Sequence, residues 1–484
     1  MAWDARFEVA FNPRTIAIVG ASPSAAQDTR PGPGATGFLL RLQKRGFPGR
    51  LYPINPKGGE VGGLKIYPNL VSVPEPIDLV IVGVPAQAVL QVLEDCIAAN
   101  ALNVHIYSSG FEETGEEEGR ELGQRVRQVI QRGKLRVLGP NCVGLYIPGA
   151  KLASWAEGCT EPGPVAFVSQ SGRLSQDYAD YAQQRRIRFS KVISYGNAYG
   201  FSNNDFLEYL ATDHATRIIG MYLEGVTDGT RFTRLAREIN KTKPLVVWKG
   251  GLTEAGARAV ASHTGALAGQ SEIWEVFYNQ TGAIRADSLD ELADVTLALL
   301  FLPPPRGKRV VHVGIGGGAS VACSDVYSRE GLEVPPLAPE TLRRLREFIP
   351  VAGASIRNPL DLPPAMRNPA LLERALELVA TDPAIDMMVI SQLDLMFRAA
   401  GKEFTRHMAS YLPRFARENL QGKPLAVMLR SWTNAPEVTA ALARLGEELL
   451  DAGIPTYPTQ ERCTRALAKF ARYYAQREGE GKRA

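Results

Sequence analysis

Short, continuously apolar segments alternate with longer amphipathic segments along almost the whole chain. The apolar segments cover residues 15–19, 78–84, 103–107, 164–168, 217–223, 244–248, 309–313, 386–390 and 424–429. Most lack a strict polar–apolar alternation, which is typical of parallel strands buried on both faces. The amphipathic patterns between them include residues 86–100, 115–132, 339–348 and 435–452. Such strand–helix alternation predicts doubly wound α/β domains.

The length of the chain predicts three domains of this kind. It has 484 residues, and a domain averages ~150 residues. A turn-rich break covers residues 158–164, and a stiffer break, Pro-Pro-Pro-Arg-Gly, covers residues 303–307. We therefore expect domains over residues 8–155, 160–302 and 306–475, followed by a short charged tail.

Composition excludes several classes of protein. Apolar residues make up 45% and charged residues 22%, and 55 basic residues against 51 acidic ones give a net charge of only +4, with no basic block to hold nucleic acid. The five cysteines are scattered without a CxxC pair, which disfavours a zinc ribbon or a disulfide framework. The first residues lack the apolar run of a signal peptide, and no apolar stretch is long enough to span a membrane. We expect a cytoplasmic enzyme without a nucleic-acid or membrane partner.

Two loops near the start of the chain have residues suited to a nucleotide-like ligand. Gly20 ends the first apolar segment, where a glycine lets the backbone approach a ligand, and Ser22 follows it. Lys57 lies in the turn after the second expected strand, where a lysine can meet a phosphate. The spacing is not GxGxxG, so a plain tight turn and a surface lysine remain the alternatives.

Two further loops each begin a predicted helix. They are Ser169-Gln-Ser-Gly172 and the triple glycine Gly316–Gly318. Backbone N–H groups at a helix start, together with the helix dipole, favour a bound phosphate or phosphoryl group. The alternative is that both glycine runs only permit close packing of helix on strand.

One of the five histidines, His263, differs from the others in its surroundings. It lies in Val260-Ala-Ser-His-Thr-Gly-Ala-Leu-Ala-Gly269, a run of small residues that permits a mobile loop and close approach to a charged ligand. A neutral imidazole is a competent nucleophile toward phosphorus near pH 7. Glu224 ends a buried-type strand, where a carboxylate can accept the imidazole N–H and orient the ring. A histidine in a plain Gly/Ala loop and an acid that only caps a helix are the alternatives.

The chain resembles the alpha subunit of an ADP-forming acyl-CoA synthetase of the acetate–CoA ligase type, in the succinyl-CoA synthetase superfamily. The resemblance covers residues 8–470 and depends on an ordered set of motifs: Val19–Ser22, Asn55–Lys57, Val84-Pro85, Ser109–Phe111, Gly139–Gly144, Ser169–Gly172, Tyr222–Gly225, Ser262–Gly269, Gly316–Gly318 and Asn358–Leu362. Each motif is weak alone, but the ordered set is specific.

The resemblance implies a CoA-binding Rossmann-like domain followed by two flavodoxin-like succinyl-CoA-ligase-type domains. In this reading, His263 is the phosphorylated residue and Glu224 its partner. The residues that match CoA contacts in the family are Gly20, Ser22, Lys57, Val84, Pro85 and Ser109, and those that match its phosphate site are Ser169, Ser171, Gly172, Gly316, Gly317 and Gly318. Phosphate attacks the acyl-CoA thioester, and the phosphoryl group then passes from an acyl phosphate to the histidine and on to ADP.

Three positions depart from the family pattern. Ala198-Tyr199-Gly200 stands where relatives have an acid, Arg173 replaces a small residue, and Ile315 replaces an asparagine. These changes concern the acyl substrate and the anion site, and they leave His263 and Glu224 intact.

The chain offers no room for an ATP-grasp domain, which needs roughly 200 further residues. The resemblance therefore implies a hetero-oligomer, in which an ATP-grasp beta subunit binds ATP or ADP with magnesium while this chain binds CoA and a carboxylic acid and holds no metal. One alternative is a nicotinamide-dependent oxidoreductase, which the missing GxGxxG and the missing acid after the second strand disfavour. Another is a non-catalytic or regulatory CoA-binding protein of the same fold.

Overall fold

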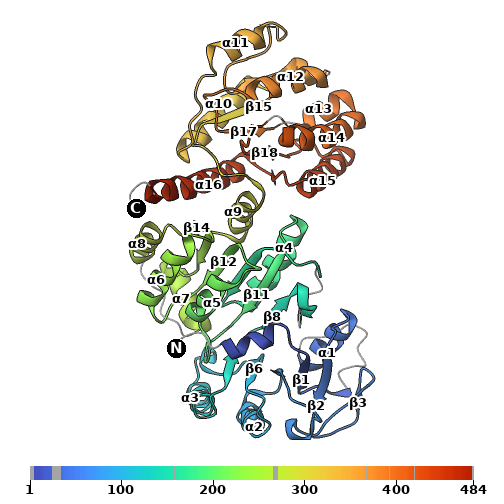
Figure 1. Cartoon of the computed structure of the whole chain (residues 1–484), viewed down its shortest axis with the longest axis vertical. Coiled ribbons are helices and arrows are strands. Elements are labelled where there is room, and N and C mark those ends of the chain that lie inside the picture. Colours follow the sequence, from blue (N-terminus) through green and yellow to red (C-terminus); the bar gives the residue numbers. More distant parts are fainter. Residues whose placement is uncertain are drawn as a thin grey trace. The chain divides into compact units, whose positions relative to one another are not determined.

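The computed structural model forms two compact units, Met1–Leu289 and Asp290–Ala484. It describes residues 5–23, 34–153, 155, 159–264, 271–350, 352–366, 368–391, 393–418 and 420–481. Figure 1 shows parallel sheets with helices packed on their faces. The predicted α/β fold is therefore confirmed.

The first sheet of the first unit is entirely parallel. Its strands are β1 (Thr15–Val19), β2 (Arg50–Ile54), β5 (Leu79–Val82), β6 (Asn103–Ile106) and β7 (Arg136–Leu138), in the order β2-β1-β5-β6-β7. The connecting helices are α1 (Ala35–Lys44), α2 (Ala86–Ala98) and α3 (Glu117–Arg132). Smaller elements are the hairpin of β3 (Glu60–Val61) and β4 (Leu64–Lys65) and the 3-10 turns η1 (Ala5–Phe11), η3 (Leu70–Ser72) and η4 (Glu112–Thr114).

The second sheet repeats this order and adds two antiparallel strands at one edge. Its parallel strands are β10 (Val165–Ser169), β11 (Phe189–Ser194), β12 (Ile218–Leu223), β13 (Leu245–Lys249) and β14 (Ile284–Ala286). The edge is extended by β8 (Leu145–Ile147) and β9 (Leu152–Ala153), with the 3-10 turn η5 (Pro148–Ala150) between them. Its helices are α4 (Gly172–Gln184), α5 (Asn203–Thr212), α6 (Gly229–Asn240), α7 (Glu254–Thr264) and α8 (Ser271–Thr281). Residues expected within 8–155 thus also contribute to this sheet.

The second unit contains a third parallel sheet of the same order. Its strands, in the order β16-β15-β17-β18-β19, are β15 (Val310–Gly314), β16 (Leu360–Asp361), β17 (Met387–Ile390), β18 (Leu425–Met428) and β19 (Thr456–Tyr457). Its helices are α9 (Leu289–Phe301), α10 (Gly317–Arg329), α11 (Pro339–Arg346), α12 (Pro369–Ala380), α13 (Leu393–Ala400), α14 (Lys402–Glu418), α15 (Pro436–Asp451) and α16 (Gln460–Gly481), with the turn η6 (Pro363–Met366).

Helix α9 packs in the second unit, although the proline run that follows it was expected to mark the boundary. Arg462 on α16 holds Asp294 of α9 through Nε–Oδ2 at 2.6 Å, and Lys469 holds Glu291 at 2.6 Å. These acids are 2% and 6% exposed, so their ion pairs fix the helix firmly to α16.

One hydrophobic core joins the first two sheets. It contains residues of β1 and α1 together with residues of β10, β12 and α5. The turn η1 lies within it, because the Phe7 ring is 4.7 Å from that of Phe201 and the Phe11 ring is 4.7 Å from that of Tyr209. Burial of these aromatic rings stabilises the contact between the two sheets, so loops from both can form one site.

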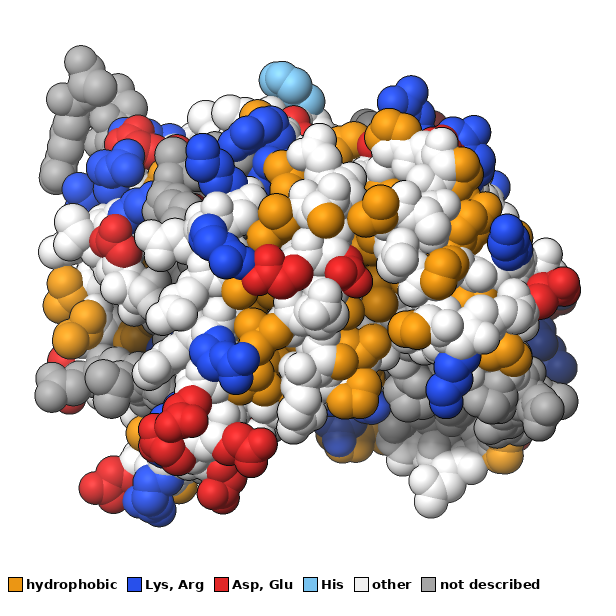
Figure 2. Space-filling model, turned by 90° about the horizontal axis from the view of Figure 1, so that it is seen from below, with side chains coloured by type: hydrophobic (Ala, Val, Ile, Leu, Met, Phe, Trp, Pro, Cys, Tyr) orange, Lys and Arg blue, Asp and Glu red, His pale blue; other side chains and the backbone are white. Residues whose placement is uncertain are grey.

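The surface shows no broad basic stripe on the face seen from below in Figure 2. Lysine and arginine side chains there are interspersed with acidic and hydrophobic ones. Among the described residues, no helix is both long enough and apolar enough to cross a membrane.

Candidate active site

The residues expected to contact CoA all follow the carboxyl ends of neighbouring parallel strands. In the order of the sheet, Lys57 follows β2, Gly20 and Ser22 follow β1, Val84 and Pro85 follow β5, and Ser109 follows β6. Ligands of doubly wound sheets bind at this edge, where the strand order reverses. The fold thus brings six residues from four separate segments to one edge.

Gly20 is required at this edge by a close approach of two backbones. Its φ is +101°, and a Cβ atom there would lie 2.4 Å from the carbonyl oxygen of Gly83. The adjoining loop is held by Asn55, whose Nδ2 donates to the carbonyl of Ala21 at 3.0 Å and whose Oδ1 accepts the Lys57 N–H at 3.1 Å. The exposed lysine is therefore presented beside the loop after β1.

A cavity of about 280 Å³ lies where loops of the first and second sheets meet. It unites four residues predicted from the sequence: Ser109, Ser171, Gly172 and Glu224. The full lining is Tyr107, Ser109, Asn141, Cys142, Val143, Gln170, Ser171, Gly172, Arg173, Gly196, Asn197 and Glu224. Expected CoA and phosphate contacts therefore border one space, together with the candidate catalytic carboxylate.

Glu224 is a buried carboxylate with one oxygen left without a partner. The side chain is 5% exposed. Its Oε1 accepts a hydrogen bond from Tyr222 Oη at 3.3 Å, while Oε2 has no partner among the described residues. A buried, unsatisfied carboxylate oxygen costs free energy unless a donor arrives, so this atom is suited to accept a hydrogen bond from a ligand or a catalytic group.

The surroundings of Glu224 contain further groups that respond to its charge. Burial and the Glu224 carboxylate both raise the pKa of Tyr222, and they raise the pKa of Tyr195 well above its ordinary value. Burial lowers the pKa of Lys249 to about 8, against the opposing effect of Glu224. Gln170 fixes the backbone here, since its Oε1 accepts from the N–H groups of Glu224 and Gly225.

The loop after β10 forms a well-ordered helix start. Ser171 Oγ caps α4 by accepting the Leu174 N–H at 3.3 Å, and Ser169 Oγ accepts the Ser171 N–H at 3.1 Å. Ser169 is fully buried and does not line the cavity, so its hydroxyl shapes the turn. The N–H groups of Gly172 and Arg173, in the first turn of α4, have no intrahelical partner. They lie at the positive end of the helix dipole, where an anion is favoured.

Arg173 adds a cation at this helix start. Its side chain is 79% exposed and pairs with Asp177 through Nη2–Oδ1 at 2.8 Å and Nε–Oδ2 at 3.0 Å. Arg173 also lines the cavity, and its pair with Asp177 uses only Nε and Nη2 of the five-donor guanidinium.

The departure at Ala198-Tyr199-Gly200 is explained by a contact with the first domain. Tyr199 Oη donates to the Glu112 carboxylate, and Arg127 lies 3.9 Å from the centre of the Tyr199 ring while pairing with Glu112. Asn197 Nδ2 donates to Glu113 Oε2 at 2.6 Å. The loop at residues 197–200 is thus tied to the acids of η4 by Tyr199 and Asn197.

His263 lies on α7, but its side chain and residues 265–270 are outside the described part of the structure. The backbone of α7 packs against η4, which follows the Ser109 loop. The backbone of the helix that carries this histidine therefore lies close to the turn that follows the Ser109 loop.

The triple glycine begins α10 in the second unit. Gly316 has φ of +105° and donates its N–H to Asp361 Oδ1 at 2.6 Å, so this amide is already used within the unit. Gly317 and Gly318 supply the first-turn amides of α10, which have no intrahelical partner. Of the three glycines, Gly317 and Gly318 are therefore the two whose N–H groups can be offered to an anion.

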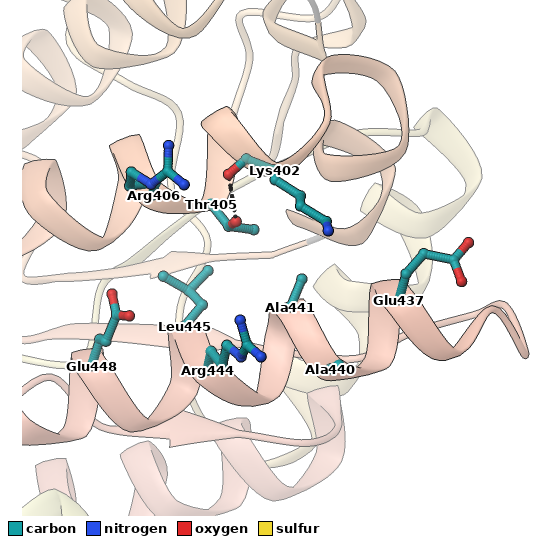
Figure 3. A pocket seen from close by; sticks show the side chains of 9 residues that line it. All are labelled: Lys402, Thr405, Arg406, Glu437, Ala440, Ala441, Arg444, Leu445 and Glu448. Carbon is teal, nitrogen blue, oxygen red and sulfur yellow. Dashed lines mark hydrogen bonds between the residues drawn. The ribbon is translucent and has the colours of Figure 1, made fainter.

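The second unit has another hollow, of about 230 Å³, between α14 and α15. Figure 3 shows Lys402 and Arg444 reaching toward each other from the two helices, and the Thr405 hydroxyl bonded to the Lys402 carbonyl at 2.9 Å. Its charged side chains are exposed, and none of the residues predicted from the sequence lines it. It lacks the buried, unpartnered acceptor that distinguishes the cavity at Glu224.

Sequence reasoning did not assign Gln170, Asn141, Asn197, Tyr222 or Lys249 to the site. Gln170, Asn141 and Tyr222 stand inside motifs that carried the family resemblance, and Asn197 begins the departing segment. Their positions signalled importance, but only the fold shows which side chains turn toward Glu224.

Comparison with known proteins agrees with this arrangement. The CoA binding domain matches residues 14–148, and the succinyl-CoA ligase like flavodoxin domain matches residues 162–299. The alpha subunit of ADP-forming acetate–CoA ligase I from Pyrococcus furiosus is 34% identical over 96% of this chain and 97% of its own length. The ADP-forming acetate–CoA ligase I of Archaeoglobus fulgidus is 32% identical over 96% of this chain but only 63% of its own length.

A solved structure shows the same similarity in three dimensions. The dinucleotide forming acetyl-coenzyme A synthetase 1 of Ca. Korarchaeum cryptofilum, in complex with phosphate and ADP, superposes with a TM-score of 0.84 at 31% identity, and the match covers 99% of each chain. The order of motifs, the two matched domains and the full-length relative agree. The chain belongs to the ADP-forming acetate–CoA ligase family of acid–thiol ligases, in its alpha-subunit form.

Proposed function

We propose that this chain is the alpha subunit of a nucleoside-diphosphate-forming acyl-CoA synthetase. It interconverts acyl-CoA, ADP and phosphate with the free acid, CoA and ATP through an acyl phosphate and a phosphohistidine. The observation that carries this proposal is the unpartnered Oε2 of the buried Glu224, in a cavity shared with Ser109 and the start of α4.

CoA occupies the carboxyl edge of the first sheet in this proposal. Gly20 allows the backbone to approach the ligand, and Lys57 meets its phosphates with an exposed ammonium group. Ser22, Val84 and Pro85 border the same edge, and Ser109 leads from it into the cavity. The thioester end of CoA would thereby reach Glu224 and the phosphate-binding loop.

Phosphate binds at the start of α4. The N–H groups of Gly172 and Arg173, the helix dipole and the Arg173 guanidinium all favour an anion there. Ser171 caps the helix, and the buried Ser169 holds the turn that aims it. Bound phosphate attacks the thioester carbonyl, the C–S bond breaks, and CoA leaves as the thiolate while an acyl phosphate forms.

His263 takes the phosphoryl group in the next step. The lone-pair nitrogen of the imidazole attacks phosphorus, the bond between phosphorus and the acyl oxygen breaks, and the acid leaves with that electron pair as a carboxylate. The other ring nitrogen keeps its proton and donates a hydrogen bond to Glu224 Oε2, whose negative charge balances the positive charge that the ring gains. The phosphohistidine then transfers the group to ADP.

The three expected domains divide this work. Residues 8–155 bind CoA, residues 160–302 carry the phosphohistidine, and residues 306–475 carry a second helix start, at Gly317 and Gly318, whose amides suit an anion. Gly316 allows the turn, and its amide stays with Asp361.

An ATP-grasp beta subunit supplies the nucleotide site, with its magnesium ion, in this proposal. The Pyrococcus relative is itself named a subunit alpha, and more than a third of the longer Archaeoglobus relative has no counterpart in this chain. In this proposal the two subunits form a hetero-oligomer, and ATP is made only when both are present.

The test is a reconstituted complex. We expect the chain, co-purified with its ATP-grasp partner, to hydrolyse ATP only when CoA and a suitable acid are present, in a screen of short, branched and aromatic acids. His263→Ala should abolish this activity without changing CoA binding. CoA binding without any phosphohistidine would indicate a non-catalytic CoA-binding protein, and tight NAD binding without CoA binding would indicate an oxidoreductase.

A further inference from the structure

Lys249 is a buried lysine beside the candidate catalytic carboxylate. It is the last residue of β13, where it pairs in register with Leu223, the residue before Glu224. Its side chain is 4% exposed, and no acid lies within ion-pair distance of it among the residues that the structure describes. A buried ammonium group is costly in free energy unless another group compensates its charge, and Glu224 is the carboxylate whose charge acts on it.

Lys249 also contacts both ends of the segment that carries His263. Its Nζ donates to the carbonyl of Gly250, which begins the connection to α7, and it lies 5.6 Å from the centre of the Trp274 ring on α8. Trp274 is 7% exposed, so this cation–π contact is shielded from water.

The connection after Lys249 is tightly fitted to Tyr222. A Cβ atom on Gly250 would lie 2.5 Å from Tyr222 Oη, the atom that donates to Glu224. Gly251 adopts φ of +78° and packs against Val260 of α7. The lysine, the double glycine and the tyrosine therefore link the start of the His263 segment to the Glu224 carboxylate.

The titratable groups around Glu224 come from four elements. Tyr222 is on β12, Tyr195 follows β11, Lys249 is on β13, and Arg173 is at the start of α4 across the cavity. Of the two cations, Arg173 is exposed and already paired with Asp177. Lys249 is thus the buried positive charge in the surroundings of Glu224.

We propose that Lys249 is a positioning residue that fixes the start of the His263 segment against Tyr222 and so orients the Glu224 carboxylate. The inference depends on the proposed function, because the proposed function makes Glu224 the acceptor of a hydrogen bond from the imidazole. It adds that this role requires the charged form of the lysine.

The charge requirement gives a distinctive pH dependence. A lysine whose pKa is about 8 is charged below that pH and neutral above it. Phosphorylation of His263 from acyl-CoA and phosphate should therefore slow as the pH rises through 8. The two tyrosines titrate at much higher pH, and the arginine stays charged throughout.

The experiment measures single-turnover formation of phosphohistidine from acyl-CoA and radiolabelled phosphate, without ADP. CoA enters as a thioester in this direction, so ionisation of its thiol does not contribute to the pH dependence. It uses the complex with the beta subunit and whichever of acetyl-CoA, isobutyryl-CoA and phenylacetyl-CoA gives the wild type its highest rate. The rate is measured as a function of pH. Lys249→Arg should move the alkaline limb of this pH–rate profile, in which the wild-type rate falls, to higher pH. Lys249→Gln should lower the rate about 10- to 100-fold with the KM for acyl-CoA changed less than about twofold, and the limb near pH 8 should be lost.

Lys243 provides the matched control. It precedes the same strand at its other end, is also partly buried with a lowered pKa, and donates to the carbonyls of Leu210 and Asp213. Lys243→Gln should reduce thermal stability and leave the pH profile unchanged. The inference is overturned if Lys249→Arg keeps the wild-type limb, or if Lys249→Gln loses only stability. Failure of His263→Ala to abolish labelling would instead contradict the proposed function.

Discussion

The hydroxyl of Tyr222 donates to Oε1 of Glu224 at 3.3 Å and so leaves the carboxylate with one oxygen free among the described residues. The two residues are separated only by Leu223, at the point where β12 ends. The strand therefore supplies both a catalytic acceptor and the group that orients it.

Glu224→Gln should lower the turnover of the complex about 10²- to 10³-fold, since the amide removes the charge that stabilises the developing imidazolium. Tyr222→Phe should cost about tenfold, because it removes one hydrogen bond to a charged group. Both effects should appear in kcat rather than in the KM for CoA. Glu238→Gln, which alters an exposed pair with Lys241, is the control and should behave as the wild type. Full turnover by Glu224→Gln would exclude the proposed role.

Gly20→Ala should impair folding of the first sheet and CoA binding together. The added Cβ would meet the Gly83 carbonyl at 2.4 Å in a backbone conformation that alanine rarely adopts. We expect a loss of about 1–3 kcal/mol in the free energy of unfolding, measured by urea denaturation, with weaker CoA binding by calorimetry. Gly59→Ala has a matching φ of +102° and would make only an ordinary contact with Pro23 at 3.6 Å, so it is the control for steric contact. Equal losses in both variants would show that backbone strain alone is responsible.

Arg173→Ala should raise the KM for phosphate about tenfold with little change in kcat. The guanidinium is a cation at the mouth of the cavity, beside the amides of the α4 helix start. Asp177→Asn frees the same arginine and should lower that KM or leave it unchanged. An unchanged KM for phosphate in Arg173→Ala would mean that the arginine serves only its pair with Asp177.

The interior of the second unit should lose stability in acid because of His312. The residue is 2% exposed, its Nδ1 is 3.0 Å from Tyr327 Oη and its Nε2 is 2.8 Å from Ser391 Oγ. Burial lowers its pKa from 6.5 to about 4. Between these values the unfolded chain binds a proton that the folded chain does not, so stability is complete above pH 6.5 and falls as the pH drops toward 4.

The difference amounts to about 3 kcal/mol when the transition is complete. His312→Gln should be less stable at pH 7 but should show a smaller loss between pH 6.5 and 5 in thermal melts of the whole chain. His214→Gln, at an exposed position, should retain the wild-type dependence. An unchanged slope in His312→Gln would contradict the assignment. His105, whose pKa is also lowered by burial to about 4, accounts for acid sensitivity that persists in the first unit.

Much of the fold could be predicted because the buried parallel strands are continuous apolar segments. The expected strand at 15–19 matches β1, and that at 217–223 differs from β12 by one residue. The strands that the sequence did not predict are short or polar. Both β16 and β19 have two residues, and β11 reads Phe-Ser-Lys-Val-Ile-Ser, a pattern without an apolar run. Pairing with neighbours far along the chain, rather than local propensity, makes them strands.

The site was only partly predictable for a related reason. The motifs with Ser109, Gly172 and Glu224 proved to border one cavity, but motifs do not show which groups within a loop face such a space. Ser169 proved to shape the turn, and the Gly316 amide is used by Asp361, a residue 45 positions later. Lys249 could not be recognised at all, because its proximity to Glu224 comes from the pairing of β12 with β13.

The most direct test of the account is the site and stoichiometry of the phosphoryl group. The complex with the beta subunit is incubated with radiolabelled phosphate and acyl-CoA, or with labelled ATP, and the modified residue is located by mass spectrometry under conditions that preserve phosphohistidine. The account predicts one acid-labile label per chain at His263 from either donor, and none in His263→Asn. A label on any other residue, or full ligase turnover by His263→Asn, would contradict it.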